Sequence, residues 1–400
     1  MTITLDEIRG NVLDLDSHEM VPTTRYEQVF GARAGKLLKE FKAFWDDAAE
    51  RYKDDPNNLA VEVEDVMAVT QGVVWETKGP SAPGAIDMDR RPDVMDVMGI
   101  RRQLIFPGFG LFAFCEAHGG GYAAMPKATP EQMQMAQDAV DDYNEWAGHH
   151  TSRYPDRLRI VGILASGVPG LTPEGLVART EKLIRKGVRS VLMSSGLPPA
   201  GLSPADPLLD PFYQLLADSN VSLVVHPPSA AGFRPGEVWG RARLPGNFPV
   251  HLGLQRAEEN LLGVMIMGGV FERHPNLRFG AIESGGFWIG PLADRLDAAL
   301  DSMQALNPRP IPDFKTDLSL KPSEYIARNV RVGVLLNEPV EEWIVRYPHL
   351  QDVYCYSSDY PHGEGQAHSM QKFYDRVAPL GDEVLKKFFM KNGELLLPAA

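Results

Sequence analysis

LRIVGIL (residues 158–164) and VRSVLM (residues 188–193) are two short runs rich in Val, Ile and Leu, and TPEGLVARTEKLIRKG (residues 172–187) lies between them. The two runs are apolar enough to form strands that are covered on both faces. The segment between them has the signals of a helix, because Thr172-Pro173 suits an N-cap and first turn and Gly187 suits the position after the last turn. The stretch therefore predicts a strand–helix–strand unit with parallel strands.

The same alternation extends over most of the chain. A capped helix is predicted from Thr129-Pro130 to about His149, and shorter helices at 211–219 and 339–347. The predicted strands are the eight runs at residues 12–18, 102–107, 158–164, 188–193, 221–226, 277–283, 330–335 and 353–359. Eight strand–helix units predict an α/β fold in which the parallel sheet closes into a (β/α)8 TIM barrel.

Two regions interrupt this repeat. Residues 20–92 separate the first two strands by far more than a strand–helix unit requires, and they include a charged stretch, 32–52, that we expect to be helical. Residues 302–322 precede the seventh strand. We expect both to be insertions within a single domain of residues 1–400, where they could cover the mouth of the active site. For the earlier insertion, a peripheral position without function is an equal alternative.

Bulk composition narrows the class of function. The 400 residues carry a formal net charge of −13 with acidic and basic residues interspersed, so the basic footprint of a nucleic-acid-binding protein is not visible. The chain has two cysteines, which suits a reducing compartment. The first residues lack the features of a secretory signal, and the longest apolar run, 261–271, is too short to span a bilayer. We therefore expect a cytoplasmic protein that acts on a small molecule and binds neither nucleic acid nor membrane.

Ligand-type side chains lie where several predicted strands end. Asp16 and His18 end the first run, His226 the fifth, Glu283 the sixth and Asp359 the eighth. In a barrel the carboxyl ends of the strands form one mouth, so these residues are expected to converge. Imidazole and carboxylate groups bind zinc, manganese or iron and leave a position open for water or substrate. The sequence therefore predicts a divalent-metal site formed by Asp16, His18, His226 and Asp359.

Four motifs around these residues resemble one known family. They are DLDSHEMVP (14–22), VVHPP (224–228), ESGGFW (283–288) and SSDYPH (357–362). In this order and at this spacing they are similar to the amidohydrolase-related group of the amidohydrolase superfamily, in the branch of aminocarboxymuconate semialdehyde decarboxylase and the aromatic-acid decarboxylases. The resemblance spans nearly the whole chain apart from the two insertions.

The resemblance implies roles for individual residues. Asp16 and His18 match the first-strand ligands, His226 the fifth-strand ligand, and Asp359 the eighth-strand carboxylate that also transfers a proton. Two positions depart from the family pattern. Asp16 replaces the His of the semialdehyde decarboxylases, and Glu283 stands where those enzymes have a catalytic His, which leaves the reaction type open.

The other polar residues leave alternatives open. Glu283 is either an acid or base beside the metal or an anchor for one of its ligands. His362 could contact substrate or pack behind Asp359. Arg234, Arg241 and Arg243 follow the fifth strand, where a guanidinium could bind a substrate carboxylate, although arginines in such a loop are more often simply exposed to solvent.

We therefore expect an enzyme with one divalent metal, zinc first and manganese second. A single metal is indicated because the fourth strand ends in Met193-Ser-Ser195 and offers no Lys to be carboxylated as a bridge. The first expectation for activity is hydrolysis of a small carboxylate-bearing or cyclic substrate by metal-activated water, with Asp359 and Glu283 as catalytic residues. The alternative is non-oxidative decarboxylation of an aromatic or unsaturated acid.

A barrel that only binds a ligand is a third possibility. It is the least favoured, because a buried cluster of Asp and His is costly without a metal to neutralise it. A homodimer is implied by the resemblance alone.

Overall fold

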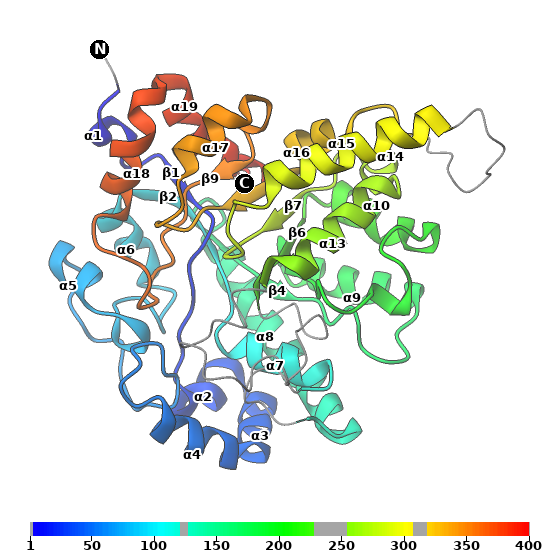
Figure 1. Cartoon of the computed structure of the whole chain (residues 1–400). Helices are drawn as coiled ribbons and strands as arrows, with labels where there is room; N and C mark the ends of the chain where they lie inside the picture. Colours follow the sequence, from blue (N-terminus) through cyan, green and yellow to red (C-terminus); the bar gives the residue numbers. More distant parts are fainter. Residues whose placement is uncertain (1–2, 121–126, 228–253, 307–317, 400) are drawn as a thin grey trace.

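Nine short parallel strands form the centre of the computed structural model, which describes residues 3–120, 127–227, 254–306 and 318–399 (Figure 1). In order of pairing they are β1 (Val12–Asp14), β2 (Ile100–Ile105), β3 (Leu158–Ile160), β4 (Gly162–Ile163), β5 (Ser190–Leu192), β6 (Ser222–Val225), β7 (Phe279–Ala281), β8 (Val330–Gly333) and β9 (Tyr354–Cys355). Each of them overlaps one of the eight predicted runs, and β3 and β4 belong to the same run.

Backbone hydrogen bonds close these strands into a ring. β3 and β4 are one strand interrupted at Val161, whose N–H donates to the Ile105 carbonyl at 2.9 Å. The gap between β1 and β9 is bridged by three bonds: Leu15 N to Tyr356 O (3.1 Å), Asp359 N to Asp16 O (2.9 Å) and His18 N to Tyr360 O (2.7 Å). Eight strand segments therefore form a closed parallel barrel in the described part of the chain, and the predicted (β/α)8 architecture is confirmed.

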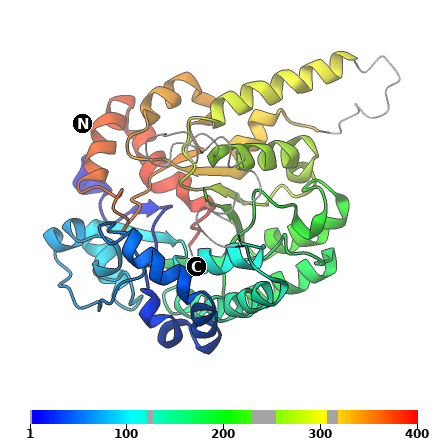
Figure 2. The ribbon, with the colours of Figure 1, turned by 60° about the horizontal axis from the view of Figure 1, so that its bottom comes forward.

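Helices surround the strands, as the two ribbon views show (Figures 1 and 2). They are α1 (Leu5–Ile8), α2 (Tyr26–Phe30), α3 (Ala32–Glu40), α4 (Lys42–Arg51), α5 (Gln71–Glu76), α6 (Arg91–Met98), α7 (Phe109–Ala117), α8 (Pro130–Arg153), α9 (Pro173–Arg185), α10 (Asp210–Asp218), α13 (Leu254–Met267), α14 (Val270–Arg273), α15 (Ile289–Leu306), α16 (Pro322–Asn329), α17 (Val340–Arg346), α18 (Ser369–Val377) and α19 (Asp382–Lys386). No helix within the described residues is both long enough and apolar enough to cross a bilayer.

The predicted helix signals act as expected. The Thr129 side chain accepts from Gln132 N in a capping box at the start of α8, and Thr172 accepts from Gly175 N at the start of α9. Gly187 follows α9 with φ +96°, a conformation that glycine adopts without a steric cost. The one difference is that α8 continues to Arg153, one turn beyond the predicted end.

The early insertion folds against the side of the barrel. Its charged stretch 32–52 forms two helices, α3 and α4, rather than the single predicted one. The backbone leaves the helical conformation at Phe41 (φ −100°, ψ 23°), whose ring packs on Phe112 of α7 at a centroid distance of 5.3 Å. Tertiary packing of an aromatic side chain here coincides with the break in the helix.

Other residues of the early insertion contact the loop that follows β9. The contacts are Gly79 N to Pro361 O (2.8 Å), the Tyr360 hydroxyl to Pro83 O (2.7 Å) and Gly363 N to Asn57 Oδ1 (2.7 Å). This loop carries Asp359 and His362, so the insertion lies beside the predicted site. Residues 307–317 of the second interruption lie outside the described residues, and its role as an insertion stays a prediction.

The last described residues lie at the opposite end of the barrel, where the strands begin. Arg102 of β2 and Arg159 of β3 donate to the carbonyl oxygens of Leu397 and Leu396, and Arg331 of β8 donates to that of Asn392. The carboxyl ends of the strands therefore form the mouth that is left for a site.

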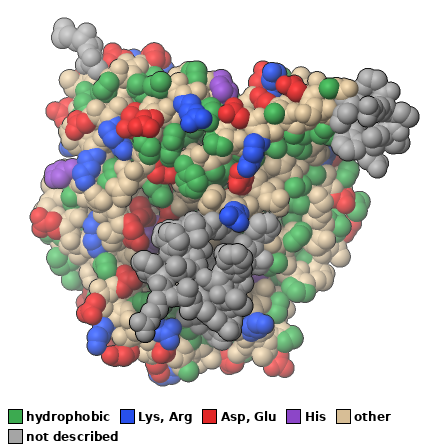
Figure 3. All heavy atoms as spheres, in the orientation of Figure 1, with side chains coloured by type: hydrophobic (Ala, Val, Ile, Leu, Met, Phe, Trp, Pro, Cys, Tyr) green, Lys and Arg blue, Asp and Glu red, His purple; other side chains and the backbone are tan. Residues whose placement is uncertain are grey.

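Over the face in Figure 3, acidic and basic side chains lie next to one another.

Candidate metal centre

Five ligand-type residues from four strand ends converge at this mouth. Asp16 and His18 follow β1, His226 follows β6 and Glu283 follows β7. One nitrogen or carboxylate oxygen from each of these four residues lies within 4.8 Å of the others, and we call them the donor group. Asp359, which follows β9, belongs to an adjoining group with His18 and His362.

His18 is the centre of both groups. Its Nε2 atom lies 3.4 Å from Asp16 Oδ1, 3.5 Å from Asp359 Oδ1 and 3.9 Å from Glu283 Oε2. On the other side of the donor group, His226 Nε2 lies 2.6 Å from Glu283 Oε2 and 4.0 Å from Asp16 Oδ1. Two imidazoles and three carboxylates thus point into one small volume.

Two of the carboxylate residues, Glu283 and Asp359, have an unusual backbone conformation. Glu283 has φ +61° and Asp359 has φ +53°, both in the left-handed region that non-glycine residues rarely adopt. Such conformations cost about 1–3 kcal/mol each and concentrate at functional sites. The hydrogen bond from Asp359 N to Asp16 O then fixes the end of β9 beside the end of β1.

Burial and charge indicate that the donor group is suited to a cation. The Asp16 and His18 side chains are each 1% exposed, and neither the two Asp16 carboxylate oxygens nor His18 Nε2 makes a hydrogen bond in the structure described. Buried polar atoms are normally bonded, so these atoms fit the role of metal ligands. Burial, together with the charges of Asp359 and Glu283, raises the pKa of Asp16 well above its usual range. A divalent cation at this place would offset that repulsion.

His362 lies against both groups. Its Nδ1 is 2.9 Å from Asp359 Oδ1, and its ring stacks on that of His18 at a centroid distance of 3.7 Å. Burial alone lowers the pKa of His362, but the carboxylates of Asp359, Glu283 and Glu364 outweigh it and raise the pKa to about 9. His362 is thus placed as the partner of Asp359, and its contact with substrate stays a prediction.

The structure brings some of the predicted site residues into the donor group and leaves others outside it. Asp16, His18 and His226 share one group as expected. Glu283, foreseen as acid, base or anchor, stands inside that group, and Asp359 stands at its edge. Arg234, Arg241 and Arg243 lie outside the described residues, so their contact with substrate stays a prediction.

Three further residues near the site escaped the sequence analysis. The Phe106 ring lies 4.6 Å from that of His226. Phe106 directly follows β2, so a search of the strand ends for aromatic as well as ligand-type residues would have found it. Glu258 of α13 is fully buried; burial, with the neighbouring Glu283 charge, raises its pKa to about 8. Burial lowers the pKa of Lys78 while nearby Asp359 opposes the shift, and its Nζ donates to the Gly365 carbonyl. No motif marks Glu258 or Lys78.

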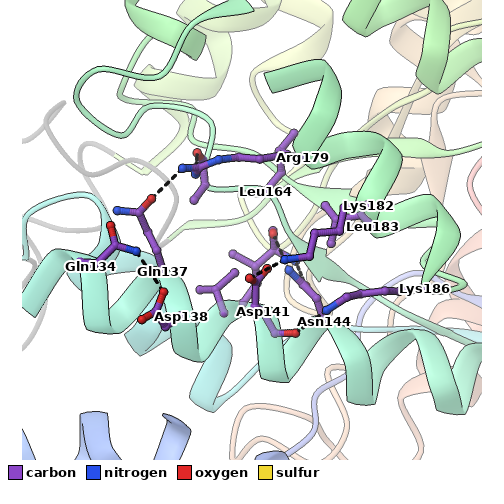
Figure 4. A pocket seen from close by; sticks show the side chains of 13 residues that line it. Gln134, Gln137, Asp138, Asp141, Asn144, Leu164, Arg179, Lys182, Leu183 and Lys186 are labelled. Atoms are coloured by element: carbon purple, nitrogen blue, oxygen red, sulfur yellow. Dashed lines mark hydrogen bonds and ion pairs between the residues drawn. The ribbon is translucent and has the colours of Figure 1, made fainter. Parts of the chain in front are cut away.

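A separate pocket lies between α8 and α9, where Lys182 pairs with Asp141 and Arg179 with Gln137 (Figure 4). It has a volume of about 180 Å³ and is also lined by Asn144, which bonds β4 through Ile163. None of the candidate ligands, Asp16, His18, His226, Glu283 and Asp359, lines it. The pocket is therefore distinct from the candidate metal centre.

A closed barrel with imidazole and carboxylate donors at the carboxyl ends of its strands is the architecture of a metal-dependent barrel enzyme. Residues 114–309 match the model of the amidohydrolase family. The predicted relationship to the amidohydrolases is confirmed, and with it the prediction of an enzyme of this class.

Solved structures share the fold. An amidohydrolase from Mycobacterium avium subsp. paratuberculosis K-10 is 23% identical, with 78% of this chain and 74% of that chain covered and a TM-score of 0.61. The 5-carboxyvanillate decarboxylase of Novosphingobium aromaticivorans DSM 12444, complexed with manganese and 4-hydroxy-3-methoxy-5-nitrobenzoic acid, is 18% identical over 97% and 96% of the two chains, with a TM-score of 0.56. The 2,6-dihydroxybenzoate decarboxylase from Rhizobium is 14% identical over 97% and 98%, also with a TM-score of 0.56.

Proposed function

We propose that this protein is a divalent-metal-dependent decarboxylase of a small aromatic or unsaturated carboxylic acid. This is the second of the two activities expected from the sequence, and it now takes precedence over hydrolysis. The observation that carries the choice is the extent of structural likeness. The two decarboxylases align over 97% of this chain, early insertion included, whereas the amidohydrolase aligns over 78%.

The donor group supports a metal-dependent reaction. Asp16, His18 and His226 would hold the ion, and Glu283 and Asp359 are the two candidates for a further carboxylate ligand. When bound, a divalent metal would supply a Lewis acid that polarises the substrate carboxylate. Zinc was the first expectation, but a carboxylate-rich set also suits manganese, the ion in the 5-carboxyvanillate decarboxylase, and we propose manganese.

Asp359 and His362 are suited to handle the proton. In decarboxylation the bond between the carbon skeleton and the carboxylate breaks, CO₂ leaves, and the carbon that keeps the electron pair gains a proton. Asp359 lies at the edge of the donor group and is 2.9 Å from His362 Nδ1, so the pair can hold a proton and deliver it at one place.

Hydrolysis remains the second candidate, because the solved structures of the same fold include an amidohydrolase. The same donors and the same carboxylate base would serve it. A substrate panel separates the two activities. We expect the Mn²⁺-loaded protein to release CO₂ from at least one hydroxybenzoate or unsaturated acid, and to lose that activity when the metal is chelated.

The measurement is detection of ¹³CO₂ from carboxyl-labelled acids, with an equal set of amides and lactones assayed for ring opening or amine release. Turnover of amides or lactones without CO₂ from any acid would contradict the proposal and restore the hydrolytic alternative. Binding of acids without turnover in either set would favour a barrel that only binds ligand.

A further inference from the structure

Arg91 heads the largest side chains that are fully buried in the described part of the chain. It is the first residue of α6 and lies at the end of the early insertion. Its guanidinium donates four hydrogen bonds: Nε to Gln103 Oε1 (2.8 Å), Nη1 to the carbonyl oxygens of His18 (3.1 Å) and Gly84 (3.0 Å), and Nη2 to the Tyr360 carbonyl (3.2 Å). It also lies over the Tyr360 ring, 4.7 Å from the centroid.

Two of these acceptors lie in or next to the candidate metal centre. His18 is a candidate ligand from the end of β1, and Tyr360 directly follows Asp359 at the end of β9. One guanidinium therefore joins the two strand ends at which the barrel closes. Its fork of donors holds both carbonyls at a fixed distance from each other.

The same connection continues beneath the site through Asp14. Gln103, which accepts from Arg91, donates from Nε2 to Asp14 Oδ2 at 2.7 Å. Asp14 also accepts from Asp16 N (3.3 Å), Ser358 N (2.8 Å) and the Ser358 hydroxyl (2.6 Å). The bonds thus end on the backbone of Asp16 on one strand and on the residue before Asp359 on the other.

None of the four acceptors of Arg91 is a carboxylate. Burial lowers the pKa of Arg91 to about 10, so the guanidinium still carries its charge at neutral pH. Burying a cation without an opposite charge in contact is an unfavourable way to stabilise a fold. This free-energy cost has a reason if the buried guanidinium keeps the residues of the metal centre in place.

We propose that Arg91 is a positioning residue for the metal centre, which fixes the first-strand ligands relative to Asp359 and thereby sets the affinity for the metal. The inference rests on the metal site proposed above. It adds that a residue which is not itself a ligand determines the metal affinity of that site. Arg91 acts through the backbone of His18 and Tyr360. Because Arg91 itself belongs to the early insertion, its bonds to the carbonyls of His18 and Tyr360 fix the insertion to the site.

The test compares Arg91→Lys with Arg159→Lys. Both substitutions keep the charge of a buried arginine but lose the fork of donors. Arg159 is the matched control, because it is 7% exposed and bonds the Leu396 carbonyl at the other end of the barrel. Mn²⁺ affinity is measured by calorimetric titration, the ligand geometry by the electron paramagnetic resonance spectrum of bound Mn²⁺, and stability by thermal unfolding of the metal-free proteins.

We expect Arg91→Lys to bind Mn²⁺ about 10–100-fold more weakly, the range typical of residues that orient ligands, and to change the spectrum. Arg159→Lys should keep wild-type affinity and spectrum whatever stability it loses. Wild-type affinity in Arg91→Lys, or equal losses in both variants that follow their losses of stability, would overturn the inference.

Should Arg91→Lys fail to fold, Gln103→Leu replaces it as the test variant, because it removes the amide that connects Arg91 to Asp14. Mn²⁺ binding is expected to weaken by the same factor. Wild-type Mn²⁺ affinity in that variant would equally overturn the inference. The two levels of the account remain separable. A wild-type protein that binds neither Mn²⁺ nor Zn²⁺ refutes the metal site itself, whereas tight binding by both wild type and Arg91→Lys refutes only the role of Arg91.

Discussion

His226→Ala is expected to lose most of its bound metal and nearly all activity while remaining folded. His226 is 2% exposed, lies just beyond β6 and brings one of the two imidazoles of the donor group. Loss of a ligand should weaken metal binding by more than the roughly 10–100-fold typical of residues that only orient ligands. The fold should persist because the side chain points into the mouth and not into the packed layers of the barrel. Metal content and circular dichroism are measured on the same sample.

His274→Ala provides a matched control for this substitution. His274 is also a buried histidine, 5% exposed, but its ring nitrogens face Gln214 and Asp210 away from the site. This variant should keep its metal. Full metal content in a folded His226→Ala protein would show that His226 is not a ligand.

Asp359→Asn is the second substitution with a large expected effect. The side chain keeps its shape but loses the charge and basicity that it presents to His362 and His18. Loss of a group that transfers a proton typically lowers the rate about 10²–10⁴-fold, for decarboxylation and hydrolysis alike. Metal binding should be weakened but retained, because the donor group of Asp16, His18, His226 and Glu283 is unchanged.

Steady-state rates of the metal-loaded Asp359→Asn protein check this expectation. Glu283→Gln is the informative companion, since Glu283 is the other carboxylate that could carry the proton. If Asp359→Asn turns over within about threefold of wild type, far less than loss of a proton carrier should cost, Asp359 has only a structural role. Glu283 would then become the leading candidate.

The fold was predictable from local signals that agree with one another. Each apolar run predicted as a strand contains one, and Thr129, Thr172 and Gly187 mark helix boundaries because their side-chain and backbone chemistry is local. The helical break at Phe41 was not predictable. It coincides with packing of the ring on Phe112, which is far away in the sequence.

The site was predictable to the extent that strand ends define it. Topology alone brings Asp16, His18 and His226 together once eight parallel strands are assumed. That Glu283 and not Asp359 completes the donor group was not predictable, because both residues have a left-handed backbone that no sequence pattern indicates. Arg91 and Lys78 lie in the early insertion or at its end, where no strand or helix period indicates what they face.

Elemental analysis of the purified protein after reconstitution with Mn²⁺ and with Zn²⁺ tests the central claim most directly, namely that the strand ends of one barrel hold a single catalytic metal. The account predicts close to one divalent metal per wild-type chain and almost none in His226→Ala, because His18 and His226 supply the only imidazoles of the donor group. Two metals per chain, or none after reconstitution with either ion, would contradict it.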